Sequence, residues 1–333
     1  MINIAFIGTS GHGGNFAING CEGMTGINFC AVAPGSVGEN VQGILPSLRH
    51  FGSDPKVYED YREMLANEKI DICVVDPFYG DHAKCAIAAL EAGCHVFCEK
   101  PVATNMEELE AVKAAWKKSG KEFCAMFNFR YTHSFYKAWQ LIQEGAIGEV
   151  RLLNGQKSYK FGTRPEFAKH RDSYGGTIPW VGIHAIDWIQ WMSGKKFLSA
   201  NAAQSRLCNN DNGELETDAL VLYQMEDEVL ASVTIDYLNP ATAPKWGDDR
   251  IRVVGTKGVL DVRSDSLTLI NGDAQGIQYP EFEPGDDWMF PDFLGQCLGD
   301  GRKCRVTAED SFAATEAALR AQESADCGCT VEI

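Results

Sequence analysis

The sequence predicts an α/β protein in two parts, an N-terminal doubly wound parallel sheet and a C-terminal α+β region with a large, mostly antiparallel, open sheet. Two observations lead to this prediction. Short apolar runs typical of buried strands alternate with helical segments over the first 125 residues. Beyond them, longer runs follow, several of which alternate apolar and polar residues, as expected of a sheet with one buried face. We therefore place two domains at residues 1–125 and 126–333, which fits a chain of this length.

The expected strands of the first domain begin almost at the N-terminus. They are Ile2–Ile7, Ile27–Ala33, Lys56–Tyr58, Ile70–Val75, His95–Cys98 and Glu122–Met126. Helices are expected at Asp60–Asn67 and His82–Ala92. A further helix of roughly fifteen residues should begin near Thr104, because Thr104 and Glu107 have the spacing of a capping box.

The second domain should contain helices at its start and at its end, with strands between them. The expected helices are Phe135–Glu144, Trp288–Leu298 and Glu309–Ala325. The expected strands are Val150–Phe161, Phe197–Leu207, Ala219–Met225, Val229–Tyr237, Arg250–Val254, Gly258–Val262 and Ser266–Ile270. A sheet with one uncovered face is available for pairing with another subunit, so we expect a homodimer or homotetramer.

Composition narrows the classes of partner. The net charge of −16 and the pI near 4.9 argue against nucleic acid and anionic membranes, because both polyanions would be repelled. Met1 runs directly into a strand without a signal-peptide pattern, and no apolar run is long enough to span a bilayer, so we expect a cytoplasmic protein. Most of the twelve cysteines sit in apolar segments and should be reduced. Cys327 and Cys329 are candidates for redox chemistry or metal binding, which the absence of a nearby His disfavours.

A glycine-rich turn follows the first strand. The segment Gly8-Thr9-Ser10-Gly11-His12-Gly13-Gly14 precedes a helical stretch, and glycines there bring backbone amides and a helix N-terminus onto a pyrophosphate. Ser10 replaces the second glycine of the usual pattern, which weakens the fingerprint. An ordinary βα turn is the alternative. The position of the glycine-rich turn after the first strand of an alternating βα chain favours dinucleotide binding.

The tip of the second strand bears on the choice of cofactor. In doubly wound sheets an acidic residue there usually holds the adenosine ribose. Here the tip ends at Ser36, the nearest carboxylate is Glu39, and no Arg or Lys lies between residues 1 and 48 to bind a 2′-phosphate. NAD and NADP both stay open, with a lean towards NAD, and Ser36 could serve either.

The charged pair Glu99-Lys100 stands at the exit of the strand His95–Cys98 and is followed by Pro101. Open α/β sheets bind ligands beyond the carboxyl ends of their strands, so Lys100 is well placed to reach a cofactor or substrate. A cis Lys100-Pro101 bond is possible at such a site. The alternative is a surface salt bridge on a loop.

A second cluster of chemically active residues follows Gly175-Gly176. The apolar pattern after Gly182 predicts a helix, on which His184 and Asp187 share a face, so that a carboxylate could orient an imidazole acting as general base. The alternative is a pair that satisfies itself in a tryptophan-lined core. No third ligand stands at a recognisable spacing, and we expect no metal.

Together these stretches resemble the Gfo/Idh/MocA oxidoreductases, named after glucose-fructose oxidoreductase, inositol dehydrogenase and MocA. The resemblance covers nearly the whole chain. It rests on the glycine turn at Gly8 to Gly13, Ala89-Leu90 to Ala92-Gly93, Glu99-Lys100-Pro101, Asn128, Arg130, Gly148, Gly175-Gly176, Gly182-x-His184-x-x-Asp187 and Gly255-Thr256-Lys257-Gly258. The Glu-Lys-Pro motif and the helix before it are specific.

The resemblance implies an N-terminal Rossmann domain and a dehydrogenase that moves hydride between a nicotinamide cofactor and a secondary hydroxyl of a sugar, polyol or sugar derivative. The catalytic residues it implies are Lys100, His184 and Asp187. The expected cofactor-binding residues are Gly8, Thr9, Ser10, Gly11, His12, Gly13, Ser36, Asp76, Pro77, His82, Glu99 and Lys100. The expected substrate-binding residues are Asn128, Arg130, Trp180 and His184.

Two positions depart from the family pattern. Relatives commonly carry Asp four residues before the histidine, where this chain has Trp180; either Asp187 or Asp172 replaces that Asp, or the chemistry differs. Trp180 could instead stack on a sugar ring. Asp76 stands where relatives often have a small polar residue. Two rival functions therefore stay open, an NAD-dependent lyase or hydrolase that oxidises a sugar transiently, and a non-enzymatic dinucleotide-sensing regulator.

Overall fold

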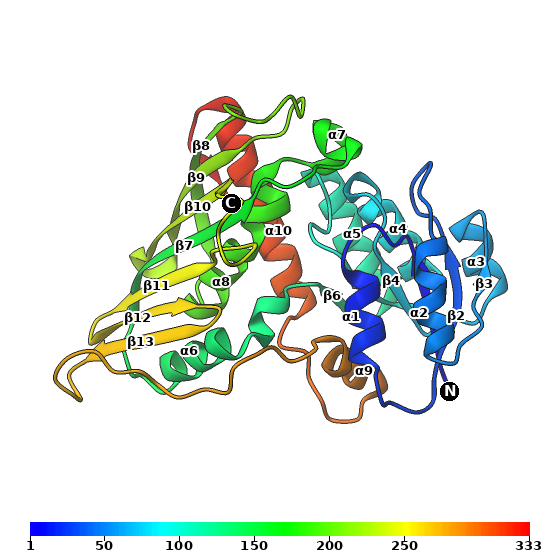
Figure 1. Cartoon of the computed structure of the whole chain (residues 1–333), viewed down its shortest axis with the longest axis horizontal. Coiled ribbons are helices and arrows are strands. Elements are labelled where there is room, and N and C mark those ends of the chain that lie inside the picture. The colour runs from blue at the N-terminus through cyan, green and yellow to red at the C-terminus, as the bar shows by residue number, and fades with distance from the viewer. The chain divides into compact units, whose positions relative to one another are not determined.

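The computed structural model describes residues 1–333, which form two compact units. The first comprises Met1–Met126, Asp172–Gly175 and Trp288–Phe312. The second comprises Phe127–Arg171, Gly176–Asp287 and Ala313–Ile333. Figure 1 traces the chain by residue number.

The first unit is built on a six-stranded sheet whose strand order is β3-β2-β1-β4-β5-β6, with every pair parallel. This confirms the predicted doubly wound parallel sheet. The strands are β1 (Ile2–Ile7), β2 (Ile27–Ala33), β3 (Lys56–Val57), β4 (Ile72–Val75), β5 (His95–Cys98) and β6 (Phe123–Ala125). All four residues of β4 are buried, as expected of a parallel strand covered on both faces.

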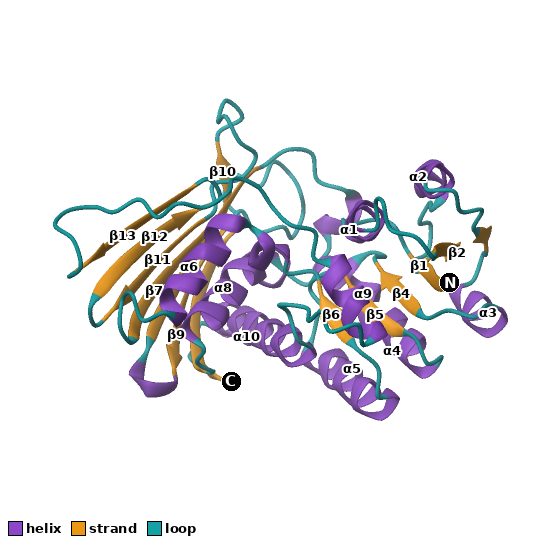
Figure 2. Cartoon of the chain, turned by 90° about the horizontal axis from the view of Figure 1, so that it is seen from below, coloured by secondary structure: helices purple, strands orange, loops and turns teal.

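Helices cover this sheet (Figure 2). They are α1 (Gly13–Gly20), α2 (Leu45–His50), α3 (Tyr61–Asn67), α4 (His82–Glu91), α5 (Met106–Ser119) and α9 (Phe290–Leu298). The predicted capping box at Thr104 was wrong. The N-cap of α5 is Asn105, whose side chain accepts a hydrogen bond from the amide of Glu108, while Thr104 donates to the Glu108 carboxylate.

The second unit is built on an eight-stranded sheet with the order β13-β12-β11-β7-β10-β9-β8-β14. Its strands are β7 (Val150–Lys160), β8 (Phe197–Ser205), β9 (Asp218–Met225), β10 (Leu230–Asn239), β11 (Arg250–Gly255), β12 (Gly258–Arg263), β13 (Ser266–Asn271) and β14 (Val331–Glu332). Only β7 and β10 pair in parallel; the other pairs are antiparallel. The predicted mostly antiparallel sheet is confirmed.

Helices α6 (His133–Gln143) and α8 (Ile183–Ser193) lie on one face of this sheet, as Figure 2 shows. Along β9 the side chains alternate between buried and exposed. The uncovered face carries the exposed leucines Leu152, Leu220, Leu222 and Leu230. This is the open face that the alternating sequence pattern predicts.

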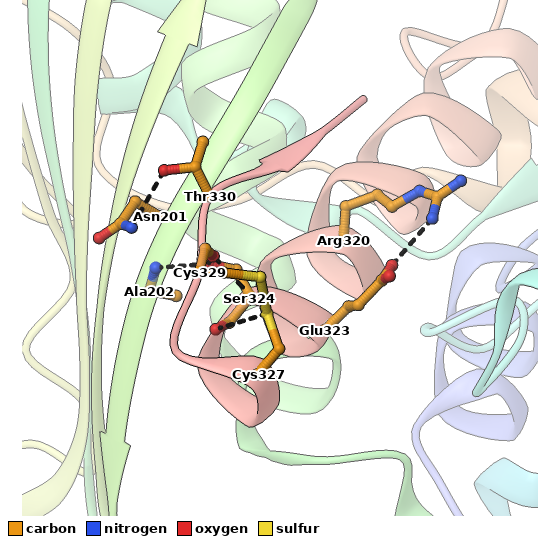
Figure 3. The surroundings of a disulfide bond; sticks show 8 residues. All are labelled: Asn201, Ala202, Arg320, Glu323, Ser324, Cys327, Cys329 and Thr330. Atoms are coloured by element: carbon orange, nitrogen blue, oxygen red, sulfur yellow. Dashed lines mark hydrogen bonds and ion pairs between the residues drawn. A yellow bond between two sulfur atoms is a disulfide. The ribbon is translucent and has the colours of Figure 1, made fainter.

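The C-terminal segment contains features that the sequence did not reveal. Helix α10 (Ala308–Cys327) is followed by a disulfide between Cys327 and Cys329, whose Cα atoms lie 5.4 Å apart (Figure 3). Gly328 between them has φ +65°, a conformation that glycine adopts without strain. After this turn β14 pairs with β8 at the edge of the sheet. The other ten cysteines carry free thiols, as expected.

No helix of the chain combines the length and the apolar character needed to cross a bilayer. The expected cytoplasmic location stays a prediction.

Candidate active site

The glycine turn of the first unit has no room for side chains. A Cβ on Gly8, which has φ +79°, would lie 2.3 Å from the backbone nitrogen of Pro77. A Cβ on Gly11 would lie 2.3 Å from a carboxylate oxygen of Asp76, and one on Gly13 would lie 2.5 Å from the Met126 methyl group. The segment that follows β4 therefore presses directly against Gly8 and Gly11, and at Gly8, where the near atoms are backbone and φ is positive, only glycine fits.

Carboxylates accept the amide hydrogens of this turn. Asp76 accepts from the amides of Gly11, at 2.8 Å, and Gly14, at 3.3 Å. Glu99 accepts from the amide of His12, at 3.1 Å. These amides belong to the N-terminus of α1 or to the residues just before it, where unpaired N–H groups and the helix dipole favour negative charge.

A third carboxylate joins the turn to the tip of β2. Glu39 accepts from the Thr9 amide at 2.8 Å and the Ser10 hydroxyl at 2.5 Å through one oxygen. Its other oxygen accepts from the amides of Gly35 and Ser36, at 2.9 and 3.2 Å. The Ser36 hydroxyl oxygen in turn accepts from the Phe78 amide at 3.0 Å. Glu39, the carboxylate nearest in sequence to the tip of the second strand, therefore has both its oxygens engaged.

Lys100 lies at the exit of β5 and is 7 % exposed. Its peptide bond to Pro101 is cis. The Lys100 ammonium lies 3.9 Å from a carboxylate oxygen of Glu99 and 6.0 Å from the centre of the Tyr79 ring. This places a cation beside the same carboxylate that contacts the glycine turn.

His82 holds the two segments that end β4 and β5. Its Nδ1 lies 2.7 Å from the Pro101 carbonyl oxygen, and its Nε2 lies 3.2 Å from that of Pro77. Burial lowers the pKa of His82, and we assign the single hydrogen of the neutral ring to Nδ1, which makes the shorter contact. The fully buried ring therefore donates a hydrogen bond to the Pro101 carbonyl only, and it packs against the Pro77 carbonyl.

In the second unit, the π-helical turn Ile178–Gly182 leads into α8, which carries His184 and Asp187. A Cβ on Gly182 would lie 2.3 Å from the end of the Ile235 side chain, so this turn packs closely against β10. His184 is 5 % exposed, and its ring centre lies 5.3 Å from that of Phe129.

The structure shows a partner for Asp187 that the sequence did not reveal. Arg130 donates from Nη2 to Asp187 at 2.6 Å and from Nε to both carboxylate oxygens, at 3.1 and 3.2 Å. Both side chains are at most 2 % exposed. The predicted orientation of His184 by Asp187, and substrate contacts of Arg130, stay predictions.

The two other expected substrate contacts lie in the same unit. Trp180 is 7 % exposed, with its ring centre 6.2 Å from that of Tyr237 and 5.7 Å from the guanidinium carbon of Arg164. This surrounding favours a packing role. Asn128 begins the short 3-10 helix Asn128–Tyr131 and is partly exposed. Asp172, the other carboxylate considered, is exposed and belongs to the first unit.

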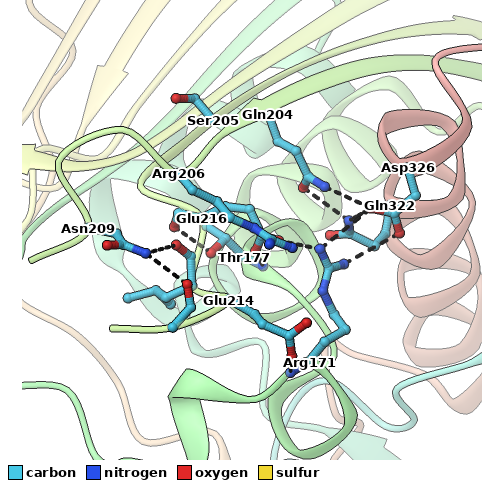
Figure 4. A network of polar contacts seen from close by, with 12 residues as sticks. Arg171, Thr177, Gln204, Ser205, Arg206, Asn209, Glu214, Glu216, Gln322 and Asp326 are labelled. Atoms are coloured by element: carbon cyan, nitrogen blue, oxygen red, sulfur yellow. Dashed lines mark hydrogen bonds and ion pairs between the residues drawn. The ribbon is translucent and has the colours of Figure 1, made fainter. Parts of the chain in front are cut away.

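A polar network fixes the start of the segment that leads to α8 (Figure 4). The Glu216 carboxylate is fully buried, pairs with Arg171 and accepts from the Thr177 amide at 3.2 Å. The Thr177 hydroxyl donates to the Glu216 carbonyl at 2.8 Å. Asp326 also pairs with Arg171, at 3.4 Å. No sequence pattern pointed to Glu216, because its partners are distant in the chain.

A buried lysine lies on β7 near Phe129. The Lys157 ammonium is 2.9 Å from Asp249 and 4.0 Å from the centre of the Phe129 ring, which also contacts His184. Desolvation lowers the pKa of Lys157 to about 8, although the nearby Asp249 raises it. The sequence did not indicate a role for Lys157 either, because a single Lys in a strand belongs to no motif.

The geometry thus assembles two sets of predicted residues. The first unit brings Lys100, Glu99 and Asp76 to the glycine turn. The second pairs Arg130 with Asp187 on α8, the helix that also carries His184. No cluster of three or more His, Cys, Asp or Glu side chains is arranged to hold a metal ion.

Comparison with known families identifies both units. The model described as "Oxidoreductase family, NAD-binding Rossmann fold" matches residues 2–127. The model described as "GFO/IDH/MocA C-terminal domain" matches residues 135–261. The chain belongs to the Gfo/Idh/MocA family of oxidoreductases.

Several members of the Gfo/Idh/MocA family are similar over much of the chain. A solved structure from Thermotoga maritima, described as an oxidoreductase, is 45 % identical with a TM-score of 0.93, and the match covers all of both chains. The uncharacterized oxidoreductase YrbE of Bacillus subtilis is 27 % identical over 83 % of this chain and 82 % of its own length. The myo-inositol 2-dehydrogenase of Thermotoga maritima is 27 % identical over 66 % of this chain and 65 % of its own length.

Proposed function

We propose that this family member is an NAD-dependent dehydrogenase that acts on a secondary hydroxyl of a sugar, polyol or sugar derivative. The observation that carries the proposal is Lys100, a nearly buried cation at the carboxyl end of β5, beside the carboxylate that contacts the glycine turn. A ligand in a doubly wound sheet lies beyond these strand ends.

The first unit fits a dinucleotide. Its glycine turn leads into the N-terminus of α1, where phosphate groups bind in such folds. The residues that would hold the cofactor are Gly8, Thr9, Ser10, Gly11, His12 and Gly13 of the turn, with Ser36, Pro77, Glu99 and Lys100 around it. Asp76 and His82 are fully buried and would support the turn and the strand ends beneath it. A bound nicotinamide would supply the hydride acceptor.

Glu39 supports NAD over NADP. Its oxygens already accept four hydrogen bonds, so it acts on the cofactor chiefly through its charge. A negative group at the tip of β2 repels a 2′-phosphate, and no basic residue before Arg49 offsets it.

The chemistry follows from the two catalytic side chains. Removing hydride from a carbinol carbon requires loss of the hydroxyl proton. The Lys100 ammonium stabilises the developing alkoxide, and the His184 imidazole accepts the proton. In this proposal Asp187 and Arg130 hold the start of α8, and Asn128 contributes to substrate binding.

Relatives support the class of substrate. Inositol 2-dehydrogenase of Salmonella typhimurium is 29 % identical over 44 % of this chain and 42 % of its own length. The myo-inositol enzyme described above also acts on a cyclic polyol. Levoglucosan dehydrogenase, solved with NADH and levoglucosan, shares the fold with a TM-score of 0.84 at 20 % identity.

We also propose that the uncovered face of the second unit's sheet pairs with a second copy of the chain. Leu230 lies directly opposite Leu152 across the parallel β7–β10 pair, and Leu220 and Leu222 extend the apolar surface on β9. A row of exposed leucines on a flat sheet is typical of an interface between subunits.

The function is tested by measuring nicotinamide reduction with NAD or NADP across a panel of sugars, polyols and sugar acids, with product analysis. Lys100→Ala should lower kcat by at least about a hundredfold while cofactor binding persists. Lys84→Ala, which removes an exposed lysine from α4, is the matched control and should leave kcat unchanged.

Three results would contradict the proposal. Full turnover by Lys100→Ala would remove the assigned catalytic lysine. Conversion of substrate without net nicotinamide reduction would favour the lyase or hydrolase reaction through transient oxidation. Cofactor binding with no reaction on any compound, together with a stable protein partner, would favour the sensor.

A further inference from the structure

The carboxyl group of Asp76 lies beneath the glycine turn. It is fully buried at the end of β4, and its carboxylate oxygens accept from the amides of Gly11 and Gly14. Helix N-termini offer such amides to anions. In this chain the Asp76 carboxyl group already holds them.

The charged groups around Asp76 do not neutralise the negative charge of its ionised carboxylate. Glu99, from the end of β5, accepts from the neighbouring His12 amide, and Glu39 contacts the same turn from the β2 side. Lys100 lies beside Glu99, 3.9 Å from its carboxylate, whereas no basic side chain pairs with Asp76. His82 is neutral through burial, and the His12 side chain is exposed.

The electrostatics of the turn indicate that Asp76 is the group whose protonation responds to a bound anion. Burial raises the pKa of Asp76 well above its usual range, the negative charges of Glu99 and Glu39 raise it further, and the two amide hydrogen bonds oppose this rise. A dinucleotide would add phosphate charge at the same turn, which favours the neutral carboxyl group still more.

We propose that Asp76 competes with the cofactor phosphates for the amides of the glycine turn, so that NAD binding is coupled to uptake of one proton by Asp76. This inference rests on the proposed function, because it requires that the turn bind a dinucleotide. It makes Asp76 a residue that sets cofactor affinity. The affinity for NAD falls as the pH rises, since the ionised carboxylate opposes binding.

The experiment measures NAD binding to the full chain by calorimetry from pH 6 to pH 9. The dissociation constant of the wild type should rise with pH by at most about tenfold per pH unit, the limit for one linked proton. Titrations in two buffers of different ionisation enthalpy should show net proton uptake, which requires no variant.

Asp76→Asn keeps an oxygen that can accept from Gly11 and removes the charge. It should bind NAD about tenfold more tightly than the wild type at pH 8, with a weaker dependence on pH. Asp54→Asn, at a side chain that is 95 % exposed, makes the same change of net charge and should match the wild type. Circular dichroism and thermal melting establish that each variant is folded.

The outcomes separate this inference from the function on which it rests. Binding of NAD that shows no proton uptake and no change of affinity in Asp76→Asn would overturn the inference alone, and would leave Asp76 as a structural support of the turn. Failure of the wild type to bind NAD or NADP at every pH would overturn the proposed function as well.

Discussion

Arg130 and Asp187 form a buried ion pair between a 3-10 helix and α8, with three hydrogen bonds and side chains that are at most 2 % exposed. The guanidinium also lies 5.5 Å from the centre of the Trp191 ring. The residues are 57 positions apart in the sequence, so this pair fixes Asn128–Tyr131 against the helix that carries His184.

Breaking this pair from one side should destabilise the protein. Either Arg130→Met or Asp187→Leu leaves one buried charge without its partner, which costs about 3–5 kcal/mol in the free energy of unfolding. The double variant Arg130→Met/Asp187→Leu should recover most of that loss. Urea unfolding of the four proteins measures this, and single variants that each lose less than about 1 kcal/mol would contradict a coupled buried pair.

Cofactor preference should depend on Glu39. Wild-type protein should show a higher kcat/KM with NAD than with NADP, and Glu39→Gln should reduce that ratio about tenfold by removing the charge that repels a 2′-phosphate. Glu39 also accepts four hydrogen bonds, so the variant's fold must be checked. Val37→Arg, at a side chain that is 98 % exposed, adds a nearby cation and should shift the ratio the same way. An unchanged ratio in both variants would exclude this region from cofactor selection.

The buried Lys157 should make stability depend on pH in the alkaline range. Its pKa is about 8 in the folded protein and about 10.4 in an unfolded chain. Between these values the unfolded state binds more protons, so the free energy of unfolding attributable to Lys157 rises with pH, by at most about 1.4 kcal/mol per unit. Below pH 8 Lys157 is protonated in both the folded and the unfolded state, so this gain in the free energy of unfolding is absent.

This dependence is measured as a difference, because several buried thiols with raised pKa values oppose it at high pH. The free energy of unfolding of the wild type minus that of Lys157→Met should increase from pH 8 to pH 10. The exposed Lys118→Met should show no such trend. A difference that stays flat would mean that Lys157 keeps an ordinary pKa.

The open sheet face should hold the oligomer together. Leu222→Glu places a charge in the middle of β9, where the leucine is 52 % exposed, and should convert the oligomer to monomers in light scattering and sedimentation. Leu207→Glu makes the same change at a side chain that is 77 % exposed, outside the strands, and should leave the mass unchanged. A wild-type monomer would contradict the proposed interface.

Local patterns predicted most of the fold. The strands β1, β2 and β5 have the bounds expected from their apolar runs, and α8 begins directly after Gly182 as the pattern indicated. These elements are determined by short-range periodicity and by glycine. The parallel pairing of β7 with β10 and the edge strand β14 could not be predicted, because they depend on contacts between distant segments.

The sequence indicated the motifs of the candidate site, but it did not indicate the buried charged residues and ion pairs around them. Lys100 and His184 stand in recognisable patterns, whereas Glu216, Lys157 and the pairing of Asp187 with Arg130 have no local signature. A buried charge is explained by the residue across the fold that neutralises it, and sequence spacing does not reveal that residue.

The tight contact between the glycine turn and the residues after β4 has an evolutionary consequence. Gly8 is required by the Pro77 backbone that presses on it from within the first unit, whether or not a nucleotide is bound. A descendant that had abandoned redox chemistry would therefore retain Gly8 under selection for folding alone. In such a lineage, loss of enzymatic activity would change the proposed catalytic residues Lys100 and His184 long before it changed this glycine.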